Sequence, residues 1–137
     1  MKTIKLFVFL LALGLATGCK SDDDNNSQGT LFGTWTLKSV TGGFGGANQQ
    51  YEPGVITWTF NDDGTVDVVN GQIPDTGYEF FETGTYDYQV LSVNGTADCD
   101  GAMIIDATGF GCMDVGTNTL KFDQRDADGF LVTLRKL

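Results

Sequence analysis

The residues of this sequence that could do chemistry are three cysteines and eighteen aspartates and glutamates, and the chain contains no histidine. A Ser-His-Asp or Cys-His nucleophile therefore cannot form, because its general base is missing. The Gly-x-Ser-x-Gly, P-loop and His-Glu-x-x-His motifs are also absent. Most of the neighbouring carboxylates lie in turn-forming segments. We therefore predict a protein that is not an enzyme and that uses no cofactor.

Two of the acidic segments carry part of a calcium-loop pattern. Residues 98–101 (DCDG) and 126–129 (DADG) each have two aspartates before a glycine. In an EF-hand register the twelfth positions would be Ala107 and Arg135, where the calcium loop needs a glutamate. We therefore expect two turns here and no metal site.

The segment before the first cysteine has the pattern of a secretory leader. Lys2 and Lys5 precede an apolar run over residues 6–15, which is too short to cross a bilayer core of about 30 Å and suits the h-region of a signal peptide. Residues 16–19 (ATGC) then resemble the lipobox of bacterial lipoproteins. This resemblance implies that residues 1–18 are removed. It also implies that Cys19 carries diacylglycerol on its thiol and an acyl chain, such as palmitate, on its new amino group.

Residues 19–29 (CKSDDDNNSQG) contain no apolar residue after Cys19, and we expect them to form a flexible acidic tether. An acidic run directly after the cysteine resembles the surface-export signal of Bacteroidota lipoproteins. It implies an outer-membrane protein, lipid-anchored and exposed at the cell surface, with a periplasm-facing anchor as the alternative. A plain secreted protein with an unmodified Cys19 is the alternative to the anchor itself. Two or three acyl chains would hold the protein firmly on a membrane.

Residues 30–137 remain and are enough for one small domain. The formal net charge of the sequence is −10, and residues 1–18 hold two lysines and no acidic residue, so residues 19–137 carry −10 − 2 = −12. Such an acidic surface argues against a nucleic-acid partner and against electrostatic docking on anionic lipid.

The two remaining cysteines, Cys99 and Cys112, form an even pair in a protein expected to be exported. Such a pair indicates a disulfide. The alternative is a metal site, but zinc would need two further ligands and there is no histidine to supply them.

Hydrophobic side chains alternate with polar ones along most of residues 30–137, which indicates strands rather than helices. The segments predicted as strands are 31–38, 56–61, 66–68, 86–90, 103–106, 120–123 and 130–135, with a short one at 78–81. Hairpin-type turns such as Asp63-Gly64 and Asp128-Gly129 join several of them. We therefore predict an all-β domain, a small antiparallel up-and-down barrel of seven or eight strands, with a β-sandwich as the alternative. Residues 41–54 are left as a long Gly-rich loop, and such loops are often functional.

Four short motifs, taken in order, resemble lipocalins and, more closely, the lipocalin-like domains of Bacteroidota lipoproteins. They are a Gly-x-Trp start at Gly33 and Trp35, a Trp-x-Phe and Asp-Gly-Thr hairpin over 58–65, a Gly-Thr-Tyr strand at 84–86, and a last strand ending in basic residues. In lipocalins the signature tryptophan closes one end of the barrel and an arginine from the last strand packs over it. The resemblance implies these roles for Trp35 and Arg135.

Two functions fit such a domain. In the first, the barrel interior binds a small apolar or amphipathic ligand. The candidate lining residues are aromatic side chains of the predicted strands: Trp58, Phe60, Tyr86, Tyr88, Phe122 and Phe130. In the second, these aromatics fill the interior, as they do in most small barrels, and the loops contact a protein or a glycan.

Overall fold

The computed structural model describes residues 30–93 and 99–137. The predicted signal peptide, Cys19 and the tether therefore lie outside the described residues. Nine strands and a single turn of 3-10 helix, η1 (Arg125–Ala127), make up the regular structure of the described part. The strands are β1 (Gly33–Gly42), β2 (Ala47–Gln50), β3 (Ile56–Phe60), β4 (Thr65–Asn70), β5 (Gly84–Leu91), β6 (Gly101–Ile105), β7 (Thr108–Val115), β8 (Thr119–Asp123) and β9 (Phe130–Lys136).

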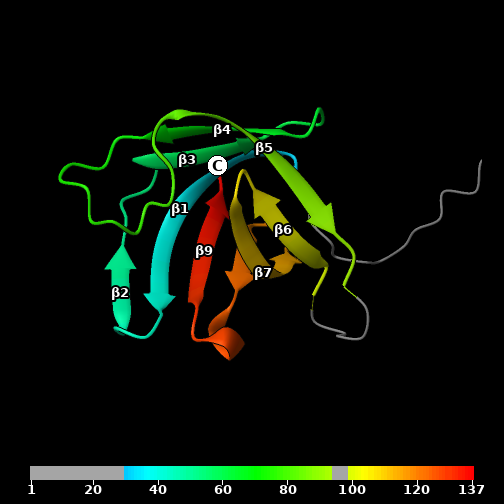
Figure 1. Cartoon of the computed structure of the whole chain (residues 1–137). Coiled ribbons are helices and arrows are strands. Elements are labelled where there is room, and N and C mark those ends of the chain that lie inside the picture. Colours follow the sequence, from blue (N-terminus) through cyan, green and yellow to red (C-terminus); the bar gives the residue numbers. More distant parts are fainter. Residues whose placement is uncertain (1–29, 94–98) are drawn as a thin grey trace, which may run out of the picture.

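Eight of these strands close into a barrel (Figure 1). Each of β3 to β8 pairs antiparallel with the next strand along the chain, and β1 pairs with β3 on one side and with β9 on the other. The extra strand, β2, pairs with the second half of β1, beyond the point where β3 ends its pairing. The predicted up-and-down barrel is therefore confirmed, and the sandwich alternative is wrong.

The strand register defines the two ends of the barrel. Trp35 pairs with Lys136 at one end, and Gly42 pairs with Phe130 at the other. We call the first the tether end, because the described chain enters there at Thr30, whose carbonyl oxygen accepts a hydrogen bond from Lys136 Nζ at 3.4 Å. The opposite, far end is formed by the connections 43–46, 51–55, 71–83 and 124–129.

The core follows from the period-two pattern of the strands. In β3, Ile56, Trp58 and Phe60 are buried and the threonines between them are only partly so. Burial of one such side chain stabilises the fold by about 1.5–3 kcal/mol. Among the described residues, the buried polar or charged side chains are Thr36 and Glu79. Thr36 donates to the carbonyl of Ile56 and accepts from Gly54 N–H.

Three local predictions were wrong or incomplete. Residues 78–81 are not a strand: they belong to the long connection 71–83, in which Phe80 has a φ of +66°. Conversely, β2 lies inside the segment predicted as a loop, and β7 was not predicted. The glycines of β7 hide its alternation, and Gly111 is needed there because a Cβ would lie 2.8 Å from the carbonyl oxygen of Asp123.

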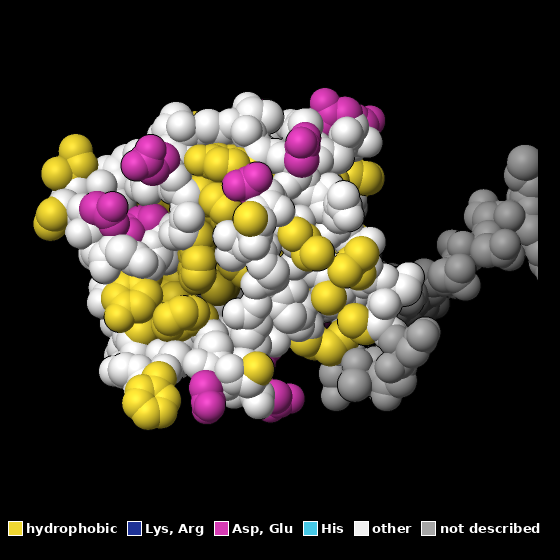
Figure 2. Space-filling model, in the orientation of Figure 1, with side chains coloured by type: hydrophobic (Ala, Val, Ile, Leu, Met, Phe, Trp, Pro, Cys, Tyr) yellow, Lys and Arg dark blue, Asp and Glu magenta, His cyan; other side chains and the backbone are white. Residues whose placement is uncertain are grey.

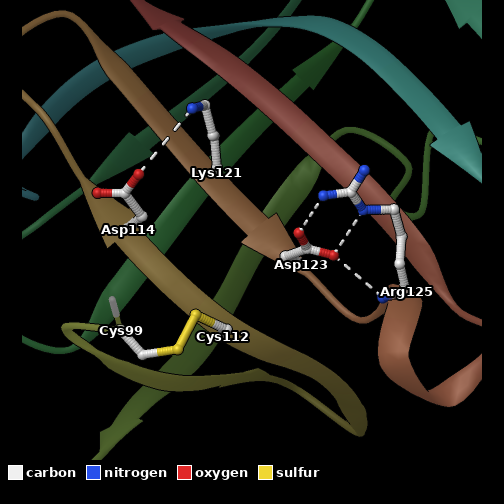
Figure 3. Close-up of polar contacts among 6 residues, drawn as sticks. All are labelled: Cys99, Cys112, Asp114, Lys121, Asp123 and Arg125. Atoms are coloured by element: carbon white, nitrogen blue, oxygen red, sulfur yellow. Dashed lines mark hydrogen bonds and ion pairs between the residues drawn. A yellow bond between two sulfur atoms is a disulfide. The ribbon is translucent and has the colours of Figure 1, made fainter. Parts of the chain in front are cut away.

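The Cys99–Cys112 disulfide is present, as predicted, with a Cα–Cα distance of 5.3 Å (Figure 3). It ties the connection before β6 to the middle of β7, across a sequence separation of 13 residues.

Removing this disulfide should lower the free energy of unfolding by about 3 kcal/mol, because it constrains a loop of this length in the unfolded chain. The test is urea unfolding of the Cys99→Ala/Cys112→Ala double variant beside the oxidised protein. An unchanged midpoint would contradict this estimate. The control is the unsubstituted protein unfolded in the presence of reductant. It has lost the disulfide but keeps both cysteines, so it separates the effect of the bond from that of the substitutions.

Candidate functional site

The barrel interior holds an aromatic cluster centred on Trp58. The Trp58 side chain is fully buried, and its ring lies 5.4–6.4 Å from the rings of four neighbours. These neighbours are Phe60, Phe81, Phe110 and Phe122. Three of the predicted lining residues, Trp58, Phe60 and Phe122, thus pack within this cluster.

The other three predicted lining residues are only partly buried. Tyr88 packs on Phe60 and donates its hydroxyl to the Asn61 carbonyl at 2.7 Å, whereas Tyr86 packs on Phe81 and donates to the Glu82 carbonyl. Phe130 begins β9 at the far end. The six candidate residues are therefore not gathered in one place. Phe130 lies at the far end of the barrel, and Tyr88 contacts Asn61, which follows β3 at the tether end.

The connection 71–83 closes the far end over this cluster. Phe81 is buried and packs against Trp58 and Phe110, while Phe80 packs against Phe110 and Phe130. Pockets of about 150, 250 and 270 Å³ bordered by described residues lie around the barrel, and these pockets are not lined by Trp58, Phe60 or Phe122. Phe60 and Phe122 instead pack against Trp58.

One polar atom in the cluster lacks a partner. The indole N–H of Trp58 is buried and donates to no acceptor, whereas the indole N–H of Trp35 donates to the Leu31 carbonyl at 2.8 Å. A buried donor without an acceptor costs about 1–3 kcal/mol. A hydrogen-bond acceptor on a bound ligand could pair with this N–H.

Trp35 of the Gly-x-Trp motif is buried near the tether end, but the cation over its ring is not Arg135. Lys136 Nζ lies 4.2 Å from the centre of the Trp35 ring and also donates to the Phe32 carbonyl. Along β9, Val132 and Leu134 are buried, so alternation turns Lys136 inward and Arg135 outward. Arg135 is exposed and lines the outer pocket of about 270 Å³. The side chain that packs over the Trp35 ring is therefore Lys136, where the resemblance implied Arg135.

The charged side chains in a strip on the outer face of β7 and β8 pair with one another (Figure 3). Lys121 pairs with Asp114 at 4.0 Å, and Arg125 pairs with Asp123 at 2.6 Å. The Arg125 guanidinium lowers the pKa of the Asp123 carboxyl group. Such exposed pairs contribute little to stability, and this strip has no unpaired charge that would point to a ligand.

The far end carries a buried carboxylate that sequence reasoning missed, since residues 78–81 were expected to form a strand. Glu79 is 3 % exposed, and its Oε1 accepts hydrogen bonds from the N–H and the hydroxyl of Thr76 at 2.9 and 2.7 Å. Its Oε2 is buried and accepts none. Burial raises the pKa of Glu79, but the hydrogen bonds from Thr76 outweigh this effect and lower the pKa to about 2. Glu79 is therefore ionised at neutral pH.

The far end also exposes two large apolar side chains. Phe44, in the turn between β1 and β2, is 99 % exposed, and Ile73, in the connection 71–83, is 90 % exposed. The two connections meet at Phe130: its ring would lie 2.5 Å from a Cβ on Gly43, and it packs on Tyr78 at 5.7 Å. Figure 2 shows hydrophobic side chains gathered in a hollow beside β2, with acidic side chains above it and no Lys or Arg on this face.

The long loop predicted to be functional thus supplies Phe44, although β2 occupies part of it. No sequence pattern singles out Ile73, because its exposure depends on how the connection 71–83 folds over the barrel.

Within residues 30–93 and 99–137, no helix has the length and hydrophobicity needed to span a membrane. The same residues hold no cluster of three or more acidic or cysteine side chains able to bind a metal ion. Comparison of the chain with models of protein families, with curated proteins and with solved structures gives no match.

Proposed function

We propose that this protein is a lipid-anchored surface module, held in the outer membrane through Cys19, whose far-end loops contact a partner protein or glycan. The barrel is of the lipocalin-like kind and serves as a rigid support with a filled interior. The observation that carries this proposal is the aromatic packing around Trp58, closed by Phe81 from the connection 71–83. It leaves the loops as the surface available for recognition.

The position of the chain entry supports the same proposal. Thr30 lies at the tether end, and Phe44 and Ile73 lie on connections at the opposite end. An anchor before residue 30 would therefore present the far end away from the membrane. Contiguous exposed apolar patches commonly mark contact sites.

Crosslinking in living cells tests this function. A photoreactive phenylalanine at position 44 should give a discrete adduct on irradiation, whereas the same residue at position 93, in the connection after β5 at the tether end, should not. Ile73→Ser should reduce the adduct yield about tenfold, because burying an Ile side chain contributes roughly 1.5–3 kcal/mol.

The matched control for Ile73 is Val69→Ser, which changes a side chain that is 54 % exposed on the outer face of β4. The proposal fails if position 93 yields the same adducts as position 44. It also fails if Ile73→Ser and Val69→Ser have equal effects.

The unpartnered indole N–H of Trp58 favours a second candidate function. In this alternative, the connection 71–83 opens and an apolar or amphipathic molecule with one hydrogen-bond acceptor enters the barrel beside Trp58. Such a molecule would co-purify with the domain and would displace Phe81 from the aromatic cluster.

A further inference from the structure

Only one of the two carboxylate oxygens of the buried Glu79 side chain accepts hydrogen bonds. Thr76 supplies two donors to Oε1 and also lies 3.3 Å, through its Oγ1, from the Tyr51 hydroxyl. This chain of contacts fixes the side chain in place. Oε2 is left without a donor, although a buried carboxylate oxygen is stable only when a hydrogen bond or a positive charge faces it.

A pocket of about 150 Å³ lies next to this carboxylate. Its lining is acidic and aromatic and contains no Lys or Arg: Asn70, Asp75, Gly77, Glu79, Phe80, Phe81 and Glu82. The Asn70 amide is already committed, since it donates to the Phe81 carbonyl and accepts from Gln72 N–H. The pocket therefore offers negative charge and ring surface, and the missing component is a cation.

We propose that this pocket binds a cationic nitrogen group, an alkylammonium or a guanidinium, with the carboxylate of Glu79 as its principal acceptor. Asp75 and Glu82 line the same pocket and add negative charge, and Phe80 and Phe81 form its apolar part. A metal ion fits less well, because the described residues contain no group of three or more ligands suited to one. The volume suits the head group of a small amine or of a side chain, and is below the range of about 300–1,000 Å³ usual for larger ligands.

Two sources could present this group: a free amine, or a Lys or Arg side chain of the partner at the far end. The second source rests on the proposed function, whereas binding of a free amine does not. The pocket is formed by the connection 71–83, which also carries Ile73, so a partner that covers Ile73 would lie close to it.

Calorimetric titration of the full chain, purified from membranes in a non-ionic detergent, tests the site directly. n-Butylammonium chloride should bind saturably with a Kd of about 1–10 mM, which corresponds to a single charged hydrogen bond with some ring contact. n-Butanol, the neutral analogue, and calcium chloride should give no saturable heat.

Glu79→Gln keeps the shape of the side chain and should weaken n-butylammonium binding at least about tenfold, since it removes the charge of the principal acceptor. Glu82→Gln changes an exposed side chain and should weaken binding by a smaller factor, which keeps the test open if Glu79→Gln does not fold. Asp62→Asn, in the exposed turn between β3 and β4 at the tether end, should leave the Kd unchanged.

The proposal is overturned if n-butanol or calcium binds as well as the amine. It is also overturned if Asp62→Asn weakens binding as much as the pocket variants do, or if the amine does not bind the unmodified protein. Crosslinking from position 44 then distinguishes the sources. A lower adduct yield in Glu79→Gln assigns the cation to the partner, and an unchanged yield assigns it to a free amine. Because that crosslink does not require the pocket, failure of the amine titration leaves the proposed function standing.

Discussion

Trp58→Ala should lower the free energy of unfolding by about 3–5 kcal/mol, the loss typical of a truncated buried tryptophan. Trp58 is fully buried and contacts four other rings, so its removal leaves a void in the middle of the aromatic cluster. A domain of this size has a total stability of only about 5–15 kcal/mol. The loss should therefore appear as a large shift in the urea midpoint, and urea unfolding followed by circular dichroism measures it.

Val69→Ala is the matched control, because Val69 follows the partner of Trp58 on β4 but points outward. Its substitution should change stability by less than about 0.5 kcal/mol. A similarly small loss for Trp58→Ala would mean that the interior tolerates a void. That outcome would favour the ligand-binding alternative over the filled barrel.

Cys19→Ser should abolish membrane attachment of the processed protein. The thiol sulfur would carry the diacylglycerol, and a hydroxyl at this position cannot replace it in the implied lipidation. The variant should either remain as an uncleaved precursor or appear in the soluble fraction, which membrane fractionation and intact-mass measurement can tell apart.

Cys99→Ala/Cys112→Ala is the control for loss of a cysteine as such, and it should remain attached to the membrane. A Cys19→Ser protein that is cleaved, carries acyl chains and sediments with membranes would refute the anchor.

The strands that could be predicted from the sequence are those whose alternation is clean. In β3 and β9, one face is hydrophobic and the other polar, so the period alone locates them and indicates an antiparallel sheet. β7 could not be predicted from alternation because Gly109 and Gly111 interrupt its pattern. β2 (ANQQ) could not be predicted because its side chains are nearly all polar, and its pairing depends on the course of β1 rather than on burial.

The candidate site was less predictable than the fold. Three of the six aromatic residues chosen from the pattern do lie inside the barrel, but a pattern cannot say whether they surround a void or fill it. The answer depends on Phe81, which reaches Trp58 from a connection with no regular structure. The unpaired Glu79 oxygen depends on the same connection and on Thr76, three residues away.

The extra strand, β2, has a consequence for self-association. A closed barrel has no free edge at which another chain could extend the sheet, and this protects β proteins from aggregation. β2 pairs only with β1 in the described sheet, so its other side is an exposed edge. It is four residues long and rich in amides, with Gly-rich segments before it and Pro53 soon after. An edge this short gives an incoming strand few backbone hydrogen bonds, so sheet extension between copies of this chain at β2 should be weak.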